Sequence, residues 1–228
     1  ANSVAGNTVL GESALDASVS GSNNTAIGKD ALTVNTSGQR NTAVGSQSSD
    51  AVTTGSFNTA IGPSSLICNT TASSNTALGF SSLYCNETGA SNTAVGTDSL
   101  KANTTGCCNV AVGMNTLEAN TTADNNTGLG YNVLVANTTG TQNTAIGANA
   151  LDANTTADNN TAIGYNSLTA NDTGKKNTAV GYGSMASNTS GQLNTAVGHD
   201  ALEYGSSGNR NTALGFEALR VNSASYYN

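Results

Sequence analysis

The sequence contains few of the residues that build most globular cores. Charged residues make up 9% of its 228 residues, aromatic residues 4%, and Trp is absent. Such a composition disfavours an ordinary globular domain and leaves two classes of protein, a disordered polar chain and a repeat array. The choice between them depends on whether apolar residues recur at a fixed interval.

Positive charge is also scarce. Seven Lys and Arg against fourteen Asp and Glu give a formal net charge of −7. No basic surface is therefore available for a phosphate backbone, and we expect no nucleic-acid partner. The sequence has no run of 18 apolar residues, so we expect no membrane span. No signal-like apolar segment follows Ala1, which indicates a processed or excised piece.

Residue types that carry out catalysis or bind metals are nearly missing. His199 is the only His; it lies beside Asp200, with no Cys or second His near it in the sequence to complete a metal site. We interpret it as a solvated loop residue. No G-x-S-x-G motif accompanies the many Ser and Thr hydroxyls. We therefore expect no metal, no cofactor and no enzymatic activity.

What the sequence has in abundance is repetition. Asn recurs every 17 residues from Asn7 to Asn211, which gives thirteen units without an insertion. With this Asn as position 1, the unit reads N-T-A-[IVL]-G-x-x-[AS]-L-x-A-N-T-[TS]-G-x-x. Charged residues occur only at positions 6, 7, 10, 13, 16 and 17, which we expect to face solvent. A period of this length indicates stacked supersecondary units.

Each unit is too short for two packed helices, and we expect two short strands in it. These are T-A-[IVL]-G and [AS]-L-x-A, separated by the Gly at position 5, with N-T-T-G as the second turn. The predicted fold is an all-β parallel solenoid of thirteen 17-residue coils over residues 7–227, after a lead-in at 1–6 and before a C-terminal end at 228. The expected core rows are position 4, always Ile, Val or Leu, and position 9, usually Leu. The Asn at position 1 is expected to bond from coil to coil as an amide ladder.

Position 3 is Ala in eleven of the thirteen units. Since neighbouring residues of a strand point to opposite faces, this row should face away from the core formed by position 4. An outward Ala row is an apolar stripe that favours self-association, and we take Ala145, Ala162 and Ala179 to represent it. The alternative is that small residues only allow a tight coil.

The repeat register indicates which of the four cysteines lie close together. Cys68 and Cys85 both occupy position 11 of adjacent units. Their expected separation of about 4.8 Å suits a disulfide, which predicts a bridge and an oxidising setting. Cys107 and Cys108, at positions 16 and 17, have no stacked cysteine in either neighbouring unit. They would form a vicinal bond, pair between chains or stay free; reduced thiols are the alternative for all four.

Sequons for N-glycosylation recur at position 12 of the unit. They fall at Asn35, Asn69, Asn86, Asn103, Asn120, Asn137, Asn154, Asn171 and Asn188. Three more fall at Asn23, Asn125 and Asn159. Glycans in one row would lie only about 4.8 Å apart, and Asn-Thr-Thr-Gly is also good turn chemistry. We favour a structural turn over a glycosylated row.

The repeated N-T-A-I-G and N-T-A-V-G motifs, followed by small and apolar residues, resemble the head repeats of trimeric autotransporter adhesins. They are also similar to the N-T-A-I-G-x-x-A-L repeats of phage and viral tail-fibre proteins. The likeness covers units 7–227. It implies a left-handed parallel β-roll, a homotrimer, and display outside a cell or virion, with a cell-surface glycan or receptor as a further partner.

The sequence therefore favours an extracellular structural fibre or filament subunit that binds further copies of itself. An adhesin or a trimeric receptor-binding tail-fibre shaft is the closest alternative. Ice binding is a third, because regular Thr rows on a flat solenoid can order water. The threonines at positions 13 and 14, such as Thr104 and Thr105, are adjacent rather than two apart, so they cannot share one strand face.

Overall fold

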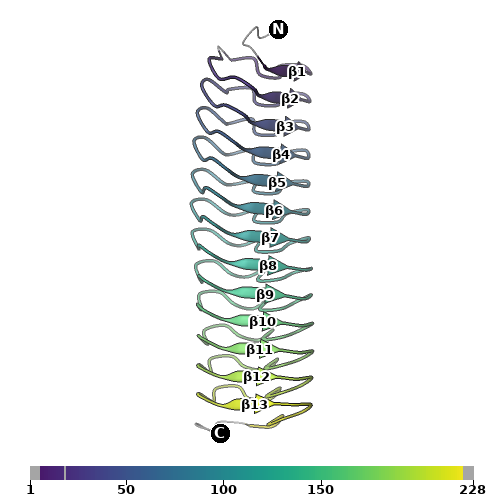
Figure 1. Cartoon of the computed structure of the whole chain (residues 1–228), viewed down its shortest axis with the longest axis vertical. Coiled ribbons are helices and arrows are strands. Elements are labelled where there is room, and N and C mark those ends of the chain that lie inside the picture. Colours follow the sequence, from purple (N-terminus) through teal and green to yellow (C-terminus); the bar gives the residue numbers. More distant parts are fainter. Residues whose placement is uncertain (1–5, 18, 223–228) are drawn as a thin grey trace. The chain divides into compact units, whose positions relative to one another are not determined.

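The computed structural model describes residues 6–17 and 19–222 and divides into two compact units, 1–114 and 115–228. Every strand has three residues, at positions 2 to 4 of its repeat (Figure 1). Unit 1 contains β1 (Thr8–Leu10), β2 (Thr25–Ile27), β3 (Thr42–Val44), β4 (Thr59–Ile61), β5 (Thr76–Leu78), β6 (Thr93–Val95) and β7 (Val110–Val112). Unit 2 contains β8 (Thr127–Leu129), β9 (Thr144–Ile146), β10 (Thr161–Ile163), β11 (Thr178–Val180), β12 (Thr195–Val197) and β13 (Thr212–Leu214). The expected lead-in, apart from Gly6, and the C-terminal residue lie outside the described residues.

Consecutive strands within each unit pair in parallel, and each residue lies opposite its equivalent in the next repeat. In unit 1, Ala26 pairs with Ala43, and in unit 2, Ala162 pairs with Ala179. The described residues contain no helix. One repeat therefore forms one coil, and the predicted all-β parallel solenoid is confirmed.

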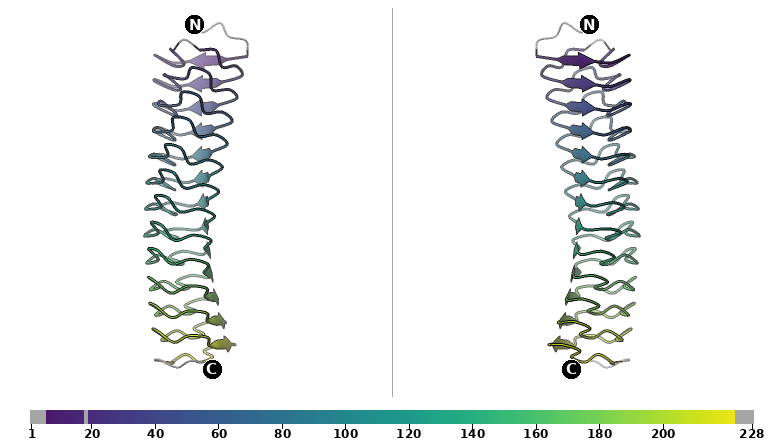
Figure 2. Two further views of the ribbon diagram at one scale, coloured as in Figure 1. Left: turned by 90° about the vertical axis from the view of Figure 1, so that its left-hand side faces the viewer. Right: turned by 90° about the vertical axis from the view of Figure 1, so that its right-hand side faces the viewer.

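Both units coil with a left hand. In the right-hand view of Figure 2, the strands of unit 1 lie nearest the viewer and point to the right while the chain descends. The strands of unit 2 do the same in Figure 1. A near side that runs rightward while the chain descends belongs to a left-handed coil, which is the handedness that the resemblance to adhesin and tail-fibre repeats implies.

The core contains the Ala row and not the Ile/Val/Leu row. Ala145, Ala162 and Ala179 are fully buried, whereas Ile163 keeps 37% of its surface exposed. The Leu of position 9, such as Leu168, is fully buried, as predicted. The side chains of a strand do alternate as expected, but in the opposite phase, and a shift of one residue exchanges the two faces. The prediction that the Ala row is an association stripe is therefore wrong.

The segment [AS]-L-x-A is a turn, so the second predicted strand is also wrong. The backbone enters the left-handed region just before this segment and again at its Leu, as at Asn166 with φ 54° and Leu168 with φ 52°. Asn tolerates this region, but it costs Leu roughly 1–2 kcal/mol. Full burial of a Leu side chain contributes about 1.5–3 kcal/mol, which offsets that cost and holds the Leu inside the coil.

The Gly at position 5 is fixed by the distance between coils. Gly181 has φ 136°, and a Cβ atom placed on it would lie 2.3 Å from the carbonyl oxygen of Gly198 in the next coil. Its own amide donates a hydrogen bond to Ile163 O at 2.7 Å. Any side chain here would separate the coils and break this hydrogen bond.

Two buried rows of Asn connect the coils. In the row at position 1, the Oδ1 atom of Asn143 accepts a hydrogen bond from Asn160 N at 2.9 Å, and its Nδ2 atom donates to Ala157 O at 2.8 Å. In the row at position 12, the Nδ2 atom of Asn154 donates to Asn137 Oδ1 at 2.8 Å and to Ala157 O at 3.1 Å. The coil-to-coil ladder predicted for position 1 is confirmed, and position 12 provides a second ladder.

Candidate interaction face

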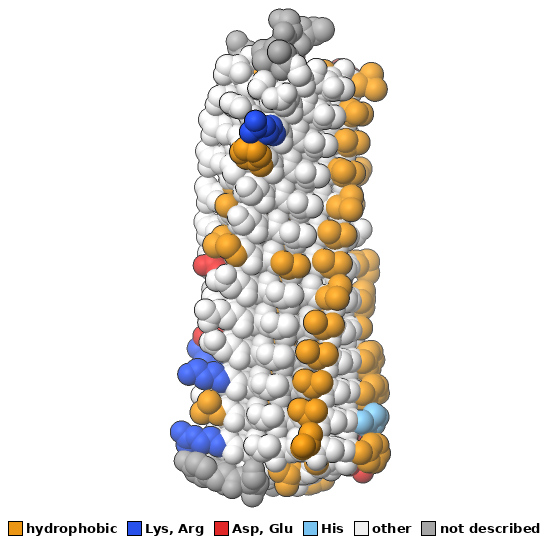
Figure 3. All heavy atoms as spheres, in the orientation of Figure 1, with side chains coloured by type: hydrophobic (Ala, Val, Ile, Leu, Met, Phe, Trp, Pro, Cys, Tyr) orange, Lys and Arg blue, Asp and Glu red, His pale blue; other side chains and the backbone are white. Residues whose placement is uncertain are grey.

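The outward side chains of the strands, at positions 2 and 4, form what we call the outer sheet face. Position 2 is Thr in every strand except at Val110, and no charged residue occurs at positions 1 to 5 of any repeat. Figure 3 shows apolar side chains gathered in columns along the molecule. In unit 1 the aliphatic row is Leu10, Ile27, Val44, Ile61, Leu78, Val95 and Val112, and in unit 2 it is Leu129, Ile146, Ile163, Val180, Val197 and Leu214.

This aliphatic row is half-exposed or fully exposed along its whole length. Ile61 has 39% of its surface exposed, Leu78 43% and Leu129 46%. Sequence reasoning assigned these residues to the core because they are the largest aliphatic residues of the strand. The coil interior instead takes the methyl group of Ala opposite the Leu of position 9, and the larger aliphatic residues remain outside.

A ladder of stacked rings lies next to the aliphatic row in unit 2, at position 6. Tyr165 and Tyr182 have ring centroids 5.4 Å apart, Tyr182 and His199 4.8 Å, and His199 and Phe216 5.4 Å. The Nδ1 atom of His199 lies 3.2 Å from Asp200 Oδ2. The ladder thus extends the apolar surface sideways, and the position of His199 in the repeat was the signal for its stacking role.

Other aromatic residues at position 6, Phe80 and Tyr131, are also exposed. Exposed aromatic residues in one row could stack on a ligand or make lateral contacts with a partner. Since each central ring of the ladder is covered on both faces by its neighbours, only ring edges along most of the ladder are open to a partner. This geometry suits lateral packing better than stacking of a ligand between the rings.

The cysteines lie where the register predicts. Cys68 and Cys85 are half-buried thiols at position 11 of adjacent coils, and they carry no disulfide in the structure. Cys107 is half-buried, and Cys108 is an exposed thiol without a vicinal bond to it. A bridge between Cys107 or Cys108 of two chains stays a prediction.

The nine sequons at position 12 are buried inside the coils. The fully buried Nδ2 atoms, such as those of Asn86 and Asn171, donate hydrogen bonds to the carbonyl oxygens of Gly89 and Gly174. A glycan on this nitrogen would replace a donor and could not fit within the coil. The candidate glycosylation sites Asn35, Asn69, Asn86, Asn103, Asn120, Asn137, Asn154, Asn171 and Asn188 are therefore structural in the folded chain. The three other sequons, at Asn23, Asn125 and Asn159, are exposed.

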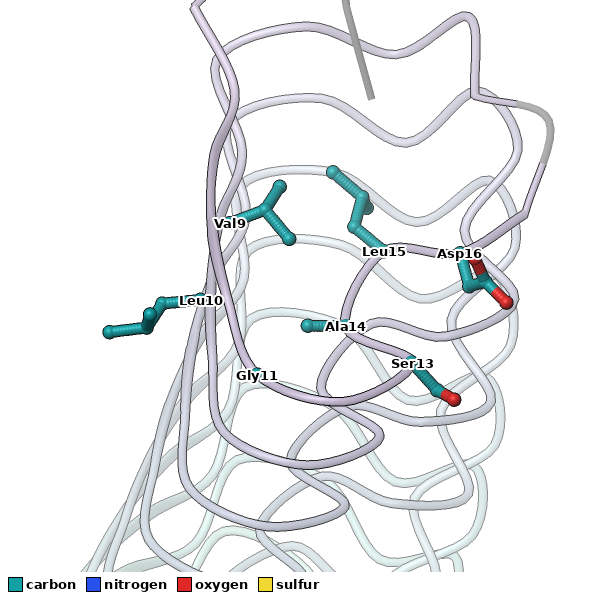
Figure 4. A pocket seen from close by; sticks show the side chains of 7 residues that line it. All are labelled: Val9, Leu10, Gly11, Ser13, Ala14, Leu15 and Asp16. Atoms are coloured by element: carbon teal, nitrogen blue, oxygen red, sulfur yellow. The ribbon is translucent and has the colours of Figure 1, made fainter. Parts of the chain in front are cut away.

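A cavity of about 320 Å³ lies at the first coil of unit 1 (Figure 4). In Figure 4, Val9 and Ala14 point into the coil interior and Leu10 points away from it. The lining offers one carboxylate, Asp16, and no second acid or base. It is lined by Val9, Leu10, Gly11, Ser13, Ala14, Leu15 and Asp16.

Among residues 6–17 and 19–222, no three His, Cys, Asp or Glu side chains gather to hold a metal ion. No helix in the same part of the chain is long and apolar enough to cross a membrane. The outer sheet face and the ring ladder beside it are therefore the strongest candidate site in the described residues. Comparisons with known protein families, with curated proteins and with solved structures give no match.

Proposed function

We propose that the protein is the subunit of an extracellular structural fibre and that its copies associate through the outer sheet face. The observation that carries the proposal is the exposed aliphatic row, which no charge interrupts in either unit. Continuous exposed apolar surface of this kind marks protein–protein contacts. The partner of the proposal is a second copy of this chain, because the row repeats with the same period in every copy.

The magnitudes are consistent with association. Full burial of an exposed aliphatic side chain contributes about 1.5–3 kcal/mol, so a half-exposed one contributes about half of that. The six aliphatic side chains of unit 2 would together contribute on the order of 6 kcal/mol on this basis. Association costs about 4–15 kcal/mol. The row of one unit thus reaches the lower part of this range, and a stable assembly would use the rows of both units.

A structural role also agrees with the chemistry of the repeat. The repeated rows carry apolar, amide and hydroxyl groups, and the Asn amides of position 1 bond from coil to coil. Such rows support a stack but supply no nucleophile with its base. The proposal therefore includes no enzymatic activity, no cofactor and no metal.

The proposed extracellular localisation rests on the cysteine pair at position 11 and on the resemblance to adhesin and tail-fibre repeats. The same outer sheet face would serve the closest alternative, the trimeric shaft of an adhesin or tail fibre. That shaft would have a cell-surface glycan or receptor as its further partner. The two functions share the self-association and differ in the presence of a target on another surface.

The experiment compares charges placed on and off the outer sheet face. In the first variant, Ile146→Glu and Val180→Glu place two carboxylates in the aliphatic row. In the control, Val135→Glu and Ala186→Glu place them at position 10, where Asp152 and other repeats already carry an acidic residue. Light scattering should give an oligomer for the wild type and the control and a folded monomer for the first variant. A monomeric wild type, or a first variant that stays oligomeric, would reject the proposal.

Ice binding is a second candidate, and one observation favours it. The threonines of position 2 and the aliphatic residues of position 4 point outward two residues apart and in register, as Thr161 and Ile163 do beside Thr178 and Val180. The adjacency that opposes ice binding at positions 13 and 14 does not apply to this pair. Thermal hysteresis that disappears when Thr161 and Thr178 are changed to Lys would support this function, and its absence in the wild type would exclude it.

A further inference from the structure

Cys68 and Cys85 lie one above the other in unit 1. The amide of Cys68 donates to Tyr84 O at 3.1 Å, and the amide of Cys85 donates to Lys101 O at 2.9 Å, so position 11 follows the same path in successive coils. Parallel in-register neighbours lie about 4.8 Å apart, within the Cα range of roughly 4.4–6.8 Å that a disulfide accepts. The expected spacing of the two Cα atoms is therefore compatible with a disulfide.

No other repeat carries a cysteine at position 11. Ala51 precedes the pair in the coil before and Ala102 follows it in the coil after. Both thiols are half-buried and therefore reachable by a small reagent. Burial raises the pKa of the Cys68 thiol, and the nearby Cys85 and Glu87 raise it further.

We propose that Cys68 and Cys85 are a reversible redox site, which a low-molecular-weight disulfide oxidises to an intrachain bridge between two coils. One cysteine thiolate attacks the small disulfide, forms a mixed disulfide and releases one small thiolate. The second cysteine thiolate then attacks the protein sulfur of the mixed disulfide and releases the other. The two cysteines are oxidised and lose two protons, and the small disulfide is reduced to two thiols.

Both thiols are half-buried, so either can supply the thiolate that attacks the small disulfide, and the other completes the bridge. The bridge would fasten the coil of 58–74 to the coil of 75–91, so that these two coils could not separate while it is closed.

The test uses the full chain with Cys107 and Cys108 both changed to Ser, so that only the pair can react. Folded protein is incubated with oxidised glutathione, alkylated and mapped without reduction. We expect one crosslinked peptide that contains Cys68 and Cys85, a higher midpoint of thermal unfolding than in the reduced protein, and reversal of both by dithiothreitol. A free Cys85 thiol after this oxidation would overturn the proposal.

Two matched variants test whether the bridge forms because the two coils are adjacent in the folded protein or because cysteines react in unfolded chains. In the first, Cys68→Ala with Ala102→Cys leaves cysteines at 85 and 102 in adjacent coils, and this pair should bridge as the wild type does. In the second, Cys85→Ala with Ala102→Cys leaves cysteines at 68 and 102, two coils apart, and this pair should stay reduced. Equal crosslinking in both variants would show that the bridge does not depend on the folded register and would reject the site.

Discussion

Gly128 and Thr116 compensate for each other inside the first coils of unit 2. A Cβ atom placed on Gly128 would lie 2.6 Å from Thr116 Cγ2. Other strands of unit 2 carry Ala where Gly128 lies, and the other repeats, except at Val133, carry a smaller Ala or Ser where Thr116 lies. The extra methyl group of Thr116 thus occupies the space that an Ala side chain fills in other coils.

The first prediction follows from this contact. Gly128→Ala should destabilise the protein by about 1–3 kcal/mol, because an extra methyl group overpacks a filled interior. Thr116→Ser should remove most of this cost in the double variant, since it deletes the methyl group that the new Cβ meets. Urea unfolding of both single variants and the double variant measures the coupling. Additive effects of the two changes would contradict the compensation.

A second prediction compares two glycines of one coil. Gly181→Ala should cost more than about 2 kcal/mol, because φ 136° is strained for any side chain and the new Cβ meets the backbone of the next coil. Gly183 has φ 60°, a value that Asn adopts at the same position of other coils, such as Asn166. Gly183→Asn should therefore cost less than Gly181→Ala, because its backbone is not strained and the new Cβ would meet only the side-chain carboxylate of Asp200, not backbone. Similar unfolding midpoints for the two variants would contradict the assignment of position 5 as a Gly-only site.

A third prediction concerns how the free energy of unfolding changes at acidic pH. Burial of the Asp158 carboxyl would raise its pKa, but hydrogen bonds from Lys175 and Thr141 outweigh this effect and lower the pKa. The stabilisation is therefore present above the unfolded pKa of about 3.9 and is lost as the pH falls through the lowered folded pKa. Because the pair is partly exposed, it contributes less than about 1 kcal/mol.

Asp158→Asn should thus lower the free energy of unfolding near pH 7 and leave it almost unchanged near pH 2. Denaturant titrations at the two pH values check this difference. As a control, Asp50→Asn removes a carboxylate from another coil. A loss at pH 2 as large as that at pH 7 would show that the contribution of Asp158 does not come from its charge.

A fourth prediction uses the two classes of sequon. In cells that carry out N-glycosylation, folded protein should carry glycans only at the exposed Asn23, Asn125 and Asn159, because a glycan on a buried Asn blocks closure of the coil. Mass spectrometry of tryptic and chymotryptic glycopeptides would locate them. Glycans on Asn86 or Asn137 in folded material would contradict the buried second ladder.

The 17-residue period of the fold could be predicted from the sequence, but which face of each strand points into the coil could not. Thirteen equally spaced Asn residues require one coil per repeat, whatever the direction of the side chains. Ala162 and Ile163 are both apolar, so hydrophobicity alone does not say which one faces inward. The usual rule buries the larger residue, but it fails where an outer face is apolar as well.

The turn that follows each strand was hidden for a different reason. Leu168 follows a small residue in a pattern typical of a strand, and a positive φ is rare for Leu. Only the assembled coil shows that this conformation is held by burial of the side chain. The second Asn ladder was similarly concealed, because Asn154 and its neighbours spell both a sequon and a turn.

The register of the coils also restricts how the gene can change. Within each unit the coils are bonded through equivalent atoms, as Asn143 is to Asn160, so losing or gaining part of a repeat would misalign these bonds. Losing or gaining a complete repeat leaves each remaining coil with the same neighbours. Unequal recombination between repeats in steps of seventeen codons would therefore yield longer or shorter folded proteins directly, and lineages should differ in repeat number more readily than in repeat length.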